Sequence, residues 1–133
     1  MSTIEITTDA TRIDVDAALT LLRETHWARE MSRDTLLRAM QHSLCFGVLD
    51  GTRLVGLARV VTDHATFAYL TDVVIAPSMR GQGLAHRLMD QVLSHPDLQR
   101  LRRFALITSG AMRLYEDFGF SVGSGTLTYM ERR

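Results

Sequence analysis

The feature that most constrains this chain is an apolar segment that passes through a glycine-containing turn into an amphipathic helix. The apolar segment ends at Ala76, the turn holds Gly81 and Gly83, and apolar residues then recur at helical spacing from Leu84 to Val92. Glycine lets a ligand approach the main chain closely, and the free N–H groups of a helix's first turn attract anions. The pattern therefore predicts a strand, an anion-binding turn and a helix that together hold a phosphorylated cofactor.

Two common nucleotide motifs fit this turn poorly. A dinucleotide-binding fingerprint requires a third glycine where this chain has His86, and an acidic residue after the next strand, where Arg103–Thr108 provides none. A P-loop requires a lysine, and all 15 basic residues are arginine. A nucleotide-binding regulatory domain is therefore the weakest functional alternative.

Composition indicates one ordinary globular unit. With 133 residues, 46% of them hydrophobic, and a formal net charge of zero, the chain is expected to form a single domain over residues 1–133. The balanced charge argues against nucleic acid or an anionic membrane as a partner. Neither a signal-peptide pattern nor a membrane-length apolar run is present, so we expect a cytoplasmic protein. The single cysteine, Cys45, is expected to be a buried thiol.

Periodicity and turn signals predict the order of the elements. A short strand around Ile4 and Ile6 precedes two helices, which Asp14 and Ser32 are expected to cap. Because a helix connects the strand Ala65–Ala76 to the strand Arg103–Thr108, these two strands must be parallel. The other expected elements are strands Cys45–Leu49 and Arg53–Thr62, helices Gly83–Leu93 and Ala111–Phe118, and closing strands Ser121–Val122 and Thr126–Glu131.

Two motifs resemble those of the GCN5-related N-acetyltransferase (GNAT) superfamily, whose members carry acetyl-coenzyme A. Arg80-x-x-Gly83-x-Ala85 is similar to its Arg/Gln-x-x-Gly-x-Gly/Ala signature, and residues 111–120 resemble its Ala-x-x-x-Tyr-Glu-x-x-Gly-Phe segment. The order of elements agrees along nearly the whole chain. The resemblance implies an α/β (α+β) fold with a mixed, mostly antiparallel sheet of about six to seven strands, a splayed parallel central pair and about four helices.

The resemblance also implies where acetyl-CoA, the cosubstrate, binds. The main chain of Val73, Val74 and Ile75 would pair with the amides of the pantetheine arm. The pyrophosphate would lie on the turn and helix start, which comprise Arg80, Gly81, Gln82, Gly83, Leu84 and Ala85. Many family members have an asparagine where this chain has Thr108, and Thr108 and Ala111 complete the expected cofactor site.

Amine acetylation by a thioester requires a neutral amine and a stabilised leaving thiolate. Tyr115 occupies the family's tyrosine position and is the candidate acid for the thiolate, the alternative being a packed tyrosine with a structural hydroxyl. Asp72, on the apolar strand, is the candidate base or amine ligand, the alternative being a structural hydrogen-bond partner. Tyr69, Thr71, His64 or a water chain are the other possible bases.

The acceptor site is expected near Trp27 and Arg29, where the family's first two helices shape it. Trp27 would stack on an amine, and Arg29 or Arg33 would bind an acidic group, whereas the alternative is a tryptophan that anchors the helices among solvated arginines. No histidine has partners at metal-ligand spacing, so no metal site is expected.

The expected activity is transfer of the acetyl group to an amine by direct attack in a ternary complex. The amine is a small molecule or a peptide, and its identity stays open. The competing function is a noncatalytic acyl-CoA sensor or interaction module. A homodimer formed by terminal strands such as Thr126–Glu131 is a further expectation.

Overall fold

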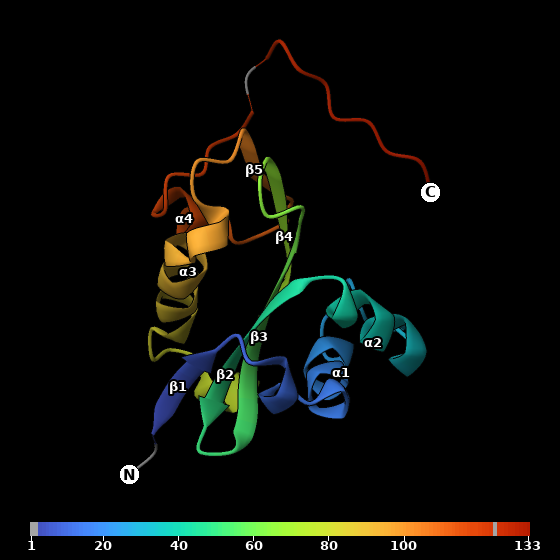
Figure 1. Cartoon of the computed structure of the whole chain (residues 1–133), viewed down its shortest axis with the longest axis vertical. Coiled ribbons are helices and arrows are strands. Elements are labelled where there is room, and N and C mark those ends of the chain that lie inside the picture. The colour runs from blue at the N-terminus through green and yellow to red at the C-terminus, as the bar shows by residue number, and fades with distance from the viewer. Residues whose placement is uncertain (1–2, 124) are drawn as a thin grey trace.

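The computed structural model of the chain describes residues 3–123 and 125–133. Within these residues, five strands form one mixed sheet in the order β1-β2-β3-β4-β5 (Figure 1). The strands are β1 (Ile4–Thr7), β2 (Leu44–Asp50), β3 (Arg53–Thr62), β4 (Phe67–Ile75) and β5 (Arg103–Leu106). The helices are α1 (Val15–Arg23), α2 (Arg33–Gln41), α3 (Leu84–Ser94) and α4 (Met112–Glu116), with short 3-10 turns η1 (Ala10–Arg12), η2 (Pro77–Met79) and η3 (Pro96–Leu98).

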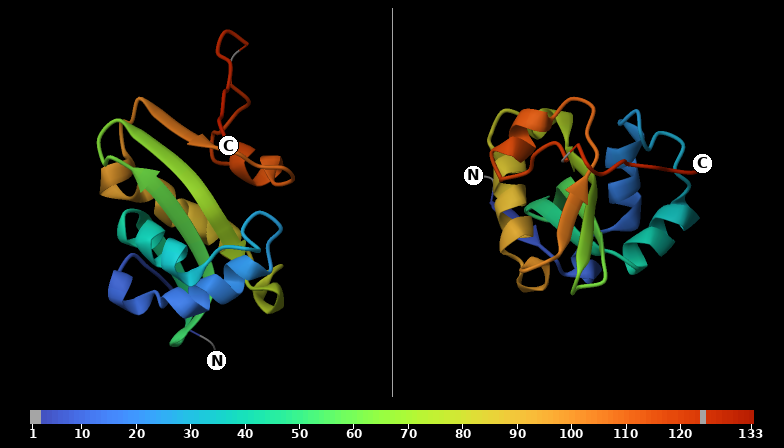
Figure 2. Two further views of the ribbon diagram at one scale, coloured as in Figure 1. Left: turned by 90° about the vertical axis from the view of Figure 1, so that its right-hand side faces the viewer. Right: turned by 90° about the horizontal axis from the view of Figure 1, so that it is seen from above.

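The sheet lies between two helical layers. Helices α1 and α2 are on one side, and α3 and α4 are on the other (Figure 2). Phe46, Leu57 and Leu88 are among the largest fully buried side chains of the resulting core. Cys45 is also buried, as expected, and burial raises the pKa of its thiol to about 11. No helix in the described part of the chain has the length and apolar character needed to cross a membrane.

The predicted helix starts are confirmed by their capping bonds. The Asp14 carboxylate accepts a hydrogen bond from the N–H of Ala17 at 2.9 Å. The Ser32 hydroxyl accepts one from the N–H of Thr35 at 3.2 Å. These side chains satisfy N–H groups that have no partner within the helix, so each fixes where its helix begins.

Strand β4 contains a bulge at Asp72. Leu57 pairs with Val74 and Arg59 pairs with Thr71, so the one residue between Leu57 and Arg59 faces two residues of β4. Asp72 has a positive φ of 55°, which is uncommon outside glycine. Such an extra residue bends a strand and changes which side chains share a face.

The parallel pairing of β4 with β5 is short. It covers Phe67–Leu70 of β4 and Arg103–Leu106 of β5 and then stops. Among the described residues, Thr71–Ile75 therefore has a strand neighbour only on its β3 side. The predicted splayed parallel pair is thus present, and it leaves main-chain groups of β4 without a sheet partner.

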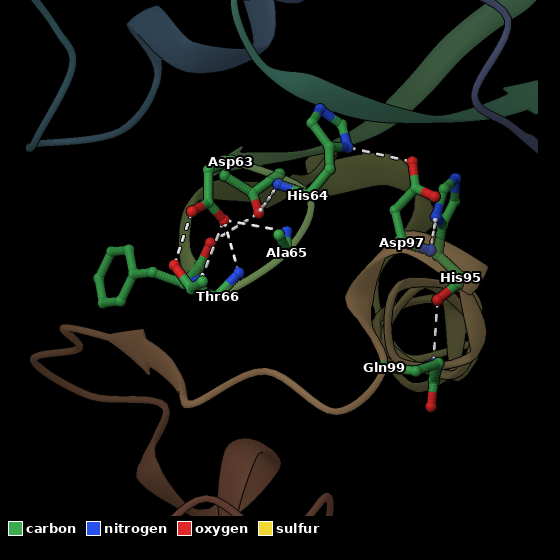
Figure 3. A network of polar contacts seen from close by, with 9 residues as sticks. Asp63, His64, Ala65, Thr66, His95, Asp97 and Gln99 are labelled. Carbon is green, nitrogen blue, oxygen red and sulfur yellow. Dashed lines mark hydrogen bonds and ion pairs between the residues drawn. The ribbon is translucent and has the colours of Figure 1, made fainter.

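The paired end of β4 and β5 is held by a polar network around the β3–β4 turn (Figure 3). The Asp63 carboxylate accepts hydrogen bonds from the Thr66 hydroxyl and from the N–H groups of residues 65–67. These bonds, with that of the Thr66 hydroxyl largest, hold the pKa of Asp63 well below its usual range. Nδ1 of the adjacent His64 lies 3.0 Å from Oδ2 of Asp97, which belongs to η3. The network therefore joins the turn to the connection between α3 and β5.

Two predictions about the C-terminal third were wrong. The described sheet has five strands, not six or seven, because residues 121–123 and 125–133 form no strand. The expected helix Ala111–Phe118 is shorter, since α4 ends at Glu116 and Gly119, with a φ of 89°, terminates the turn that follows. The segments Ser121–Val122 and Thr126–Glu131 have strand-like sequences, but neither belongs to the sheet that the described residues form.

Candidate active site

A cavity of about 410 Å³ lies beside the unpaired part of β4. The α1–α2 connection, β4, the start of α3 and α4 all contribute to its wall. Eight of the residues singled out from the sequence line it: Trp27, Val73, Val74, Ile75, Arg80, Ala85, Ala111 and Tyr115. A separate cavity of about 370 Å³ between α1 and the β2–β3 turn contains none of the predicted site residues.

The glycine turn has the geometry that an anion site requires. Gly81 and Gly83 have φ values of 79° and 75°, and a Cβ added at either would meet nothing within 4 Å. Gly83 is the N-cap of α3, and no side chain caps the helix there. The first N–H groups of α3 are therefore not taken up by a capping side chain and carry the positive end of the helix dipole.

The other predicted residues of this turn have different surroundings. Leu84 is buried in the core, so only its main chain can meet a ligand, whereas Gln82 is exposed. Nε of Arg80 donates to the carbonyl oxygen of Ile75 at 3.1 Å. This bond holds the guanidinium between the end of β4 and the turn, beside the cavity that Arg80 lines.

Tyr115 is buried against the apolar end of the cavity. Its side chain is 8% exposed, and its ring meets that of Phe120 edge to face with centroids 6.2 Å apart. Burial raises the pKa of the phenol above its usual value, so the hydroxyl stays protonated at neutral pH. In the described part of the chain, no group forms a hydrogen bond with this hydroxyl.

Thr108 stabilises the N-terminal end of α4, the helix that carries Tyr115. The Thr108 hydroxyl accepts a hydrogen bond from the N–H of Ala111, the N-cap of α4, at 3.0 Å. Tyr115 in turn donates its N–H to the carbonyl oxygen of Ala111 at 3.4 Å. Thr108 does not line the cavity and helps fix where α4 begins.

Asp72 forms a buried ion pair and does not line the cavity. Nε of Arg59 lies 2.8 Å from Oδ2 of Asp72, with side chains 14% and 4% exposed respectively. The same guanidinium donates to the Ser43 hydroxyl at 3.1 Å. This arrangement supports the structural alternative for Asp72 over the general-base role.

The loop between α1 and α2 forms one side of the cavity. Trp27 is 53% exposed and packs edge to face on His26, with ring centroids 5.3 Å apart. Thr25 anchors the loop, because its buried hydroxyl donates to the Leu22 carbonyl oxygen and accepts from the Ala28 N–H. Arg29 is exposed and is absent from the cavity wall, and Arg33 pairs with Asp16 at 2.7 Å.

Sequence reasoning missed two titratable groups of this wall. Glu24 and His26 both line the cavity, and Glu24 is also the C-cap of α1. His26 precedes Trp27 directly and Glu24 stands three residues before it, so the only available signal was their closeness in sequence to Trp27. Of the 12 residues that line the cavity, these two carry a carboxylate and an imidazole, which are the commonest general bases in enzymes.

The segments that form the cavity are also the ones through which the chain matches a known protein family. The sequence model of the Acetyltransferase (GNAT) family matches residues 14–120, which include β4, the glycine turn and α4. The chain belongs to the GNAT family of acetyltransferases. The predicted resemblance is therefore confirmed.

Individual GNAT relatives agree in sequence and fold. A protein from Gibberella zeae named "Putative acetyltransferase FG08082" is 35% identical in an alignment that covers 83% of this chain and 74% of that protein. A GNAT-family protein from Xanthomonas campestris pv. campestris is 44% identical, with a TM-score of 0.93 over 100% of this chain and 94% of that chain. The aminoglycoside N-acetyltransferase AAC(6')-Iy, solved in complex with CoA, shares the GNAT fold at 18% identity, with a TM-score of 0.74 over 100% and 97% of the two chains.

Proposed function

We propose that this GNAT-family protein transfers the acetyl group of acetyl-CoA to an amine by direct attack in a ternary complex. The observation that carries the proposal is the cavity at the split of β4 and β5. It brings the unpaired main chain of β4, the glycine turn and the hydroxyl of Tyr115 to one place. These are the three features that a thioester-linked, pyrophosphate-containing cosubstrate requires.

The residues present fit acetyl-CoA. Val73, Val74 and Ile75 line the cavity from a strand segment whose outer main-chain groups lack a sheet partner, so they can bind the amides of the pantetheine arm. The open space over Gly81 and Gly83 and the uncapped start of α3 suit the pyrophosphate. Arg80 adds a positive charge beside this turn.

Tyr115 is proposed as the acid that protonates the leaving thiolate. A thiol has an ordinary pKa near 8.5, so a phenol that stays protonated at neutral pH can donate a hydrogen bond to the thiolate as it forms. The raised pKa of Tyr115 keeps that proton in place.

The acceptor amine must lose a proton before it attacks. At pH 7.4 an ordinary primary ammonium is deprotonated in about one molecule in a thousand, an unfavourable term of about 4 kcal/mol. Glu24 and His26 are proposed to accept this proton, because they line the cavity. Asp72 is proposed to hold the bulge of β4 through its pair with Arg59, since that ion pair occupies its carboxylate.

The acceptor is proposed to carry positive charge. The wall near Trp27 offers an aromatic face and the Glu24 carboxylate, and the nearby Arg29 and Arg33 do not line the cavity. Aromatic faces and carboxylates attract cations, so polyamines, aminoglycosides and lysine-containing peptides fit better than phosphorylated amino sugars.

Two assays together test the function and separate it from the sensor alternative. Calorimetric titration with acetyl-CoA should show binding, and thiol release with a panel of the amines named above should show turnover. Binding without turnover across the panel would favour the noncatalytic acyl-CoA sensor. Failure to bind acetyl-CoA would refute both functions.

A further inference from the structure

Helix α4, which carries Tyr115, is too short to hold its own position. It has five residues, and isolated helices shorter than about 12 residues are only marginally stable in water. Tyr115 is the buried residue among the five. The place of its hydroxyl therefore depends on the contacts that attach the two ends of α4 to neighbouring elements. The Thr108 hydroxyl fixes the start of the helix through the N–H of Ala111.

The end of α4 is attached to α3 through His86. Nε2 of His86 lies 3.3 Å from Oδ2 of Asp117, the C-cap of α4. An ionised carboxylate can only accept a hydrogen bond, so Nε2 is the donor. The His86 ring also lies against the ring of Phe118, with centroids 5.5 Å apart. One side chain of α3 therefore contacts two consecutive residues at the end of α4, which lies beside it (Figure 1).

Phe118 is bonded directly to the main chain of Tyr115. The carbonyl oxygen of Tyr115 accepts a hydrogen bond from the N–H of Phe118 at 3.0 Å and another from the N–H of Phe120 at 3.1 Å. These bonds make the turn after α4 a continuation of the helix. A movement of Phe118 away from α3 would therefore also move the main chain of Tyr115 and, with it, the phenol.

His86 belongs to the first turn of α3. It stands three residues after Gly83, the N-cap, and so lies on the same turn whose N–H groups are proposed to bind the pyrophosphate. The side chains of His86 and Asp117 are 54% and 55% exposed, and such exposed pairs contribute little to overall stability. Loss of this pair should therefore change the position of α4 and leave the fold intact.

We propose that His86 is a positioning residue, which holds the hydroxyl of Tyr115 at the cavity through its contacts with Asp117 and Phe118. This inference rests on the proposed function, in which Tyr115 protonates the leaving thiolate. His86 does not line the cavity, so it acts on the reaction only through α4. A general acid must lie within hydrogen-bond reach of the group that it protonates, so a small displacement of the phenol slows the reaction.

Steady-state kinetics of His86 variants test the positioning role. His86→Leu removes the donor and the ring and should lower kcat by about threefold to tenfold, with the Kd for acetyl-CoA unchanged. His86→Gln keeps an N–H donor and should recover part of this loss. In a Tyr115→Phe background, His86→Leu should cause no further loss, because no acid is left to position. Gln91→Leu is the control, since Gln91 is exposed on α3 and does not line the cavity.

Hydrogen exchange of the free protein gives a second measurement, which does not depend on turnover. The amides of residues 115–120 should exchange faster in His86→Leu than in the parent chain and in Gln91→Leu, while those of β3 stay equally protected. A parent chain without turnover would refute the proposed function and the positioning role together. With an active parent, unchanged exchange in residues 115–120, an unchanged kcat, or an equal loss of kcat in the Tyr115→Phe background would overturn the positioning role alone.

Discussion

The guanidinium of Arg59 reaches across the bulge of β4 and binds the carboxylate of Asp72, with 2.8 Å between Nε and Oδ2. Asp72 has a positive φ of 55° in the bulge, and its side chain is 4% exposed. The pair therefore connects β3 to the irregular part of β4 that borders the cavity. The carboxylate that lines the cavity is instead that of Glu24.

Asp72→Asn should lower the free energy of unfolding by about 2 to 3 kcal/mol, because it leaves a buried arginine without its countercharge. Urea denaturation followed by circular dichroism measures this. Asp16→Asn is the matched control, since it breaks an exposed arginine pair of similar length, 2.7 Å, and should have little effect. An unchanged stability together with a lost acidic limb in the pH–rate profile would instead make Asp72 the base.

Tyr115→Phe should lower kcat by about a hundredfold or more while the Kd for acetyl-CoA stays unchanged, because only the proton donor is removed. In the parent enzyme the acid works while protonated. Its raised pKa therefore places the alkaline loss of activity above the ordinary tyrosine value near 10. Steady-state kinetics across pH should show that this limb disappears in the variant, and equal turnover in the two proteins would rule out the acid role.

Gly83→Asp should abolish acetyl-CoA binding, since it places a carboxylate where the pyrophosphate is proposed to bind. Gly51→Asp is its control: Gly51 also has a positive φ, 63°, and open space around its Cβ, but it lies in the β2–β3 turn. Both variants carry a similar backbone strain, which aspartate tolerates better than most residues. Calorimetry on the two folded proteins should show acetyl-CoA binding in Gly51→Asp alone. Binding retained in Gly83→Asp would show that the pyrophosphate does not bind at this turn.

Glu24→Gln should raise the KM for a cationic acceptor at least severalfold, because the cavity loses its carboxylate, while acetyl-CoA affinity is preserved. Glu30→Gln is the control, since Glu30 is exposed in the same connection and does not line the cavity. Kinetics at saturating acetyl-CoA measure both variants. If Glu24 is also the base, the acidic limb of kcat will change in that variant, and identical kinetics in parent and variant would contradict both roles.

The sequence was sufficient where a local rule determines the structure. Asp14 and Ser32 predicted helix starts because a short polar side chain can cap a helix, and Gly81 and Gly83 predicted the turn because positive φ values favour glycine. The parallel strand pair followed from the length of the connection between β4 and β5.

The features that the sequence did not predict depend on contacts between residues that are far apart in the sequence. The bulge at Asp72 could not be predicted from the alternation of β4, because Leu70, Asp72 and Val74 are all buried, as they would be in a regular strand. The partner of Asp72 is 13 residues away and is selected by the register of two strands. Glu24 reaches the cavity wall only through the path of the α1–α2 loop. Residues 121–122 and 126–131 were predicted to close the sheet because their composition favours a strand, and composition does not specify whether a strand edge is available to them.

The early end of β5 has a thermodynamic consequence. Because β5 pairs with only the first part of β4, main-chain N–H and C=O groups farther along β4 have no strand partner on that side in the free protein. A ligand that fills the split can form hydrogen bonds with these groups and so add contacts between β4 and the elements on the other side of the cavity. Any ligand that binds only the folded state shifts the unfolding equilibrium, by about 2.7 kcal/mol at a concentration one hundred times its Kd. The concentration of such a ligand would therefore set how resistant the protein is to unfolding.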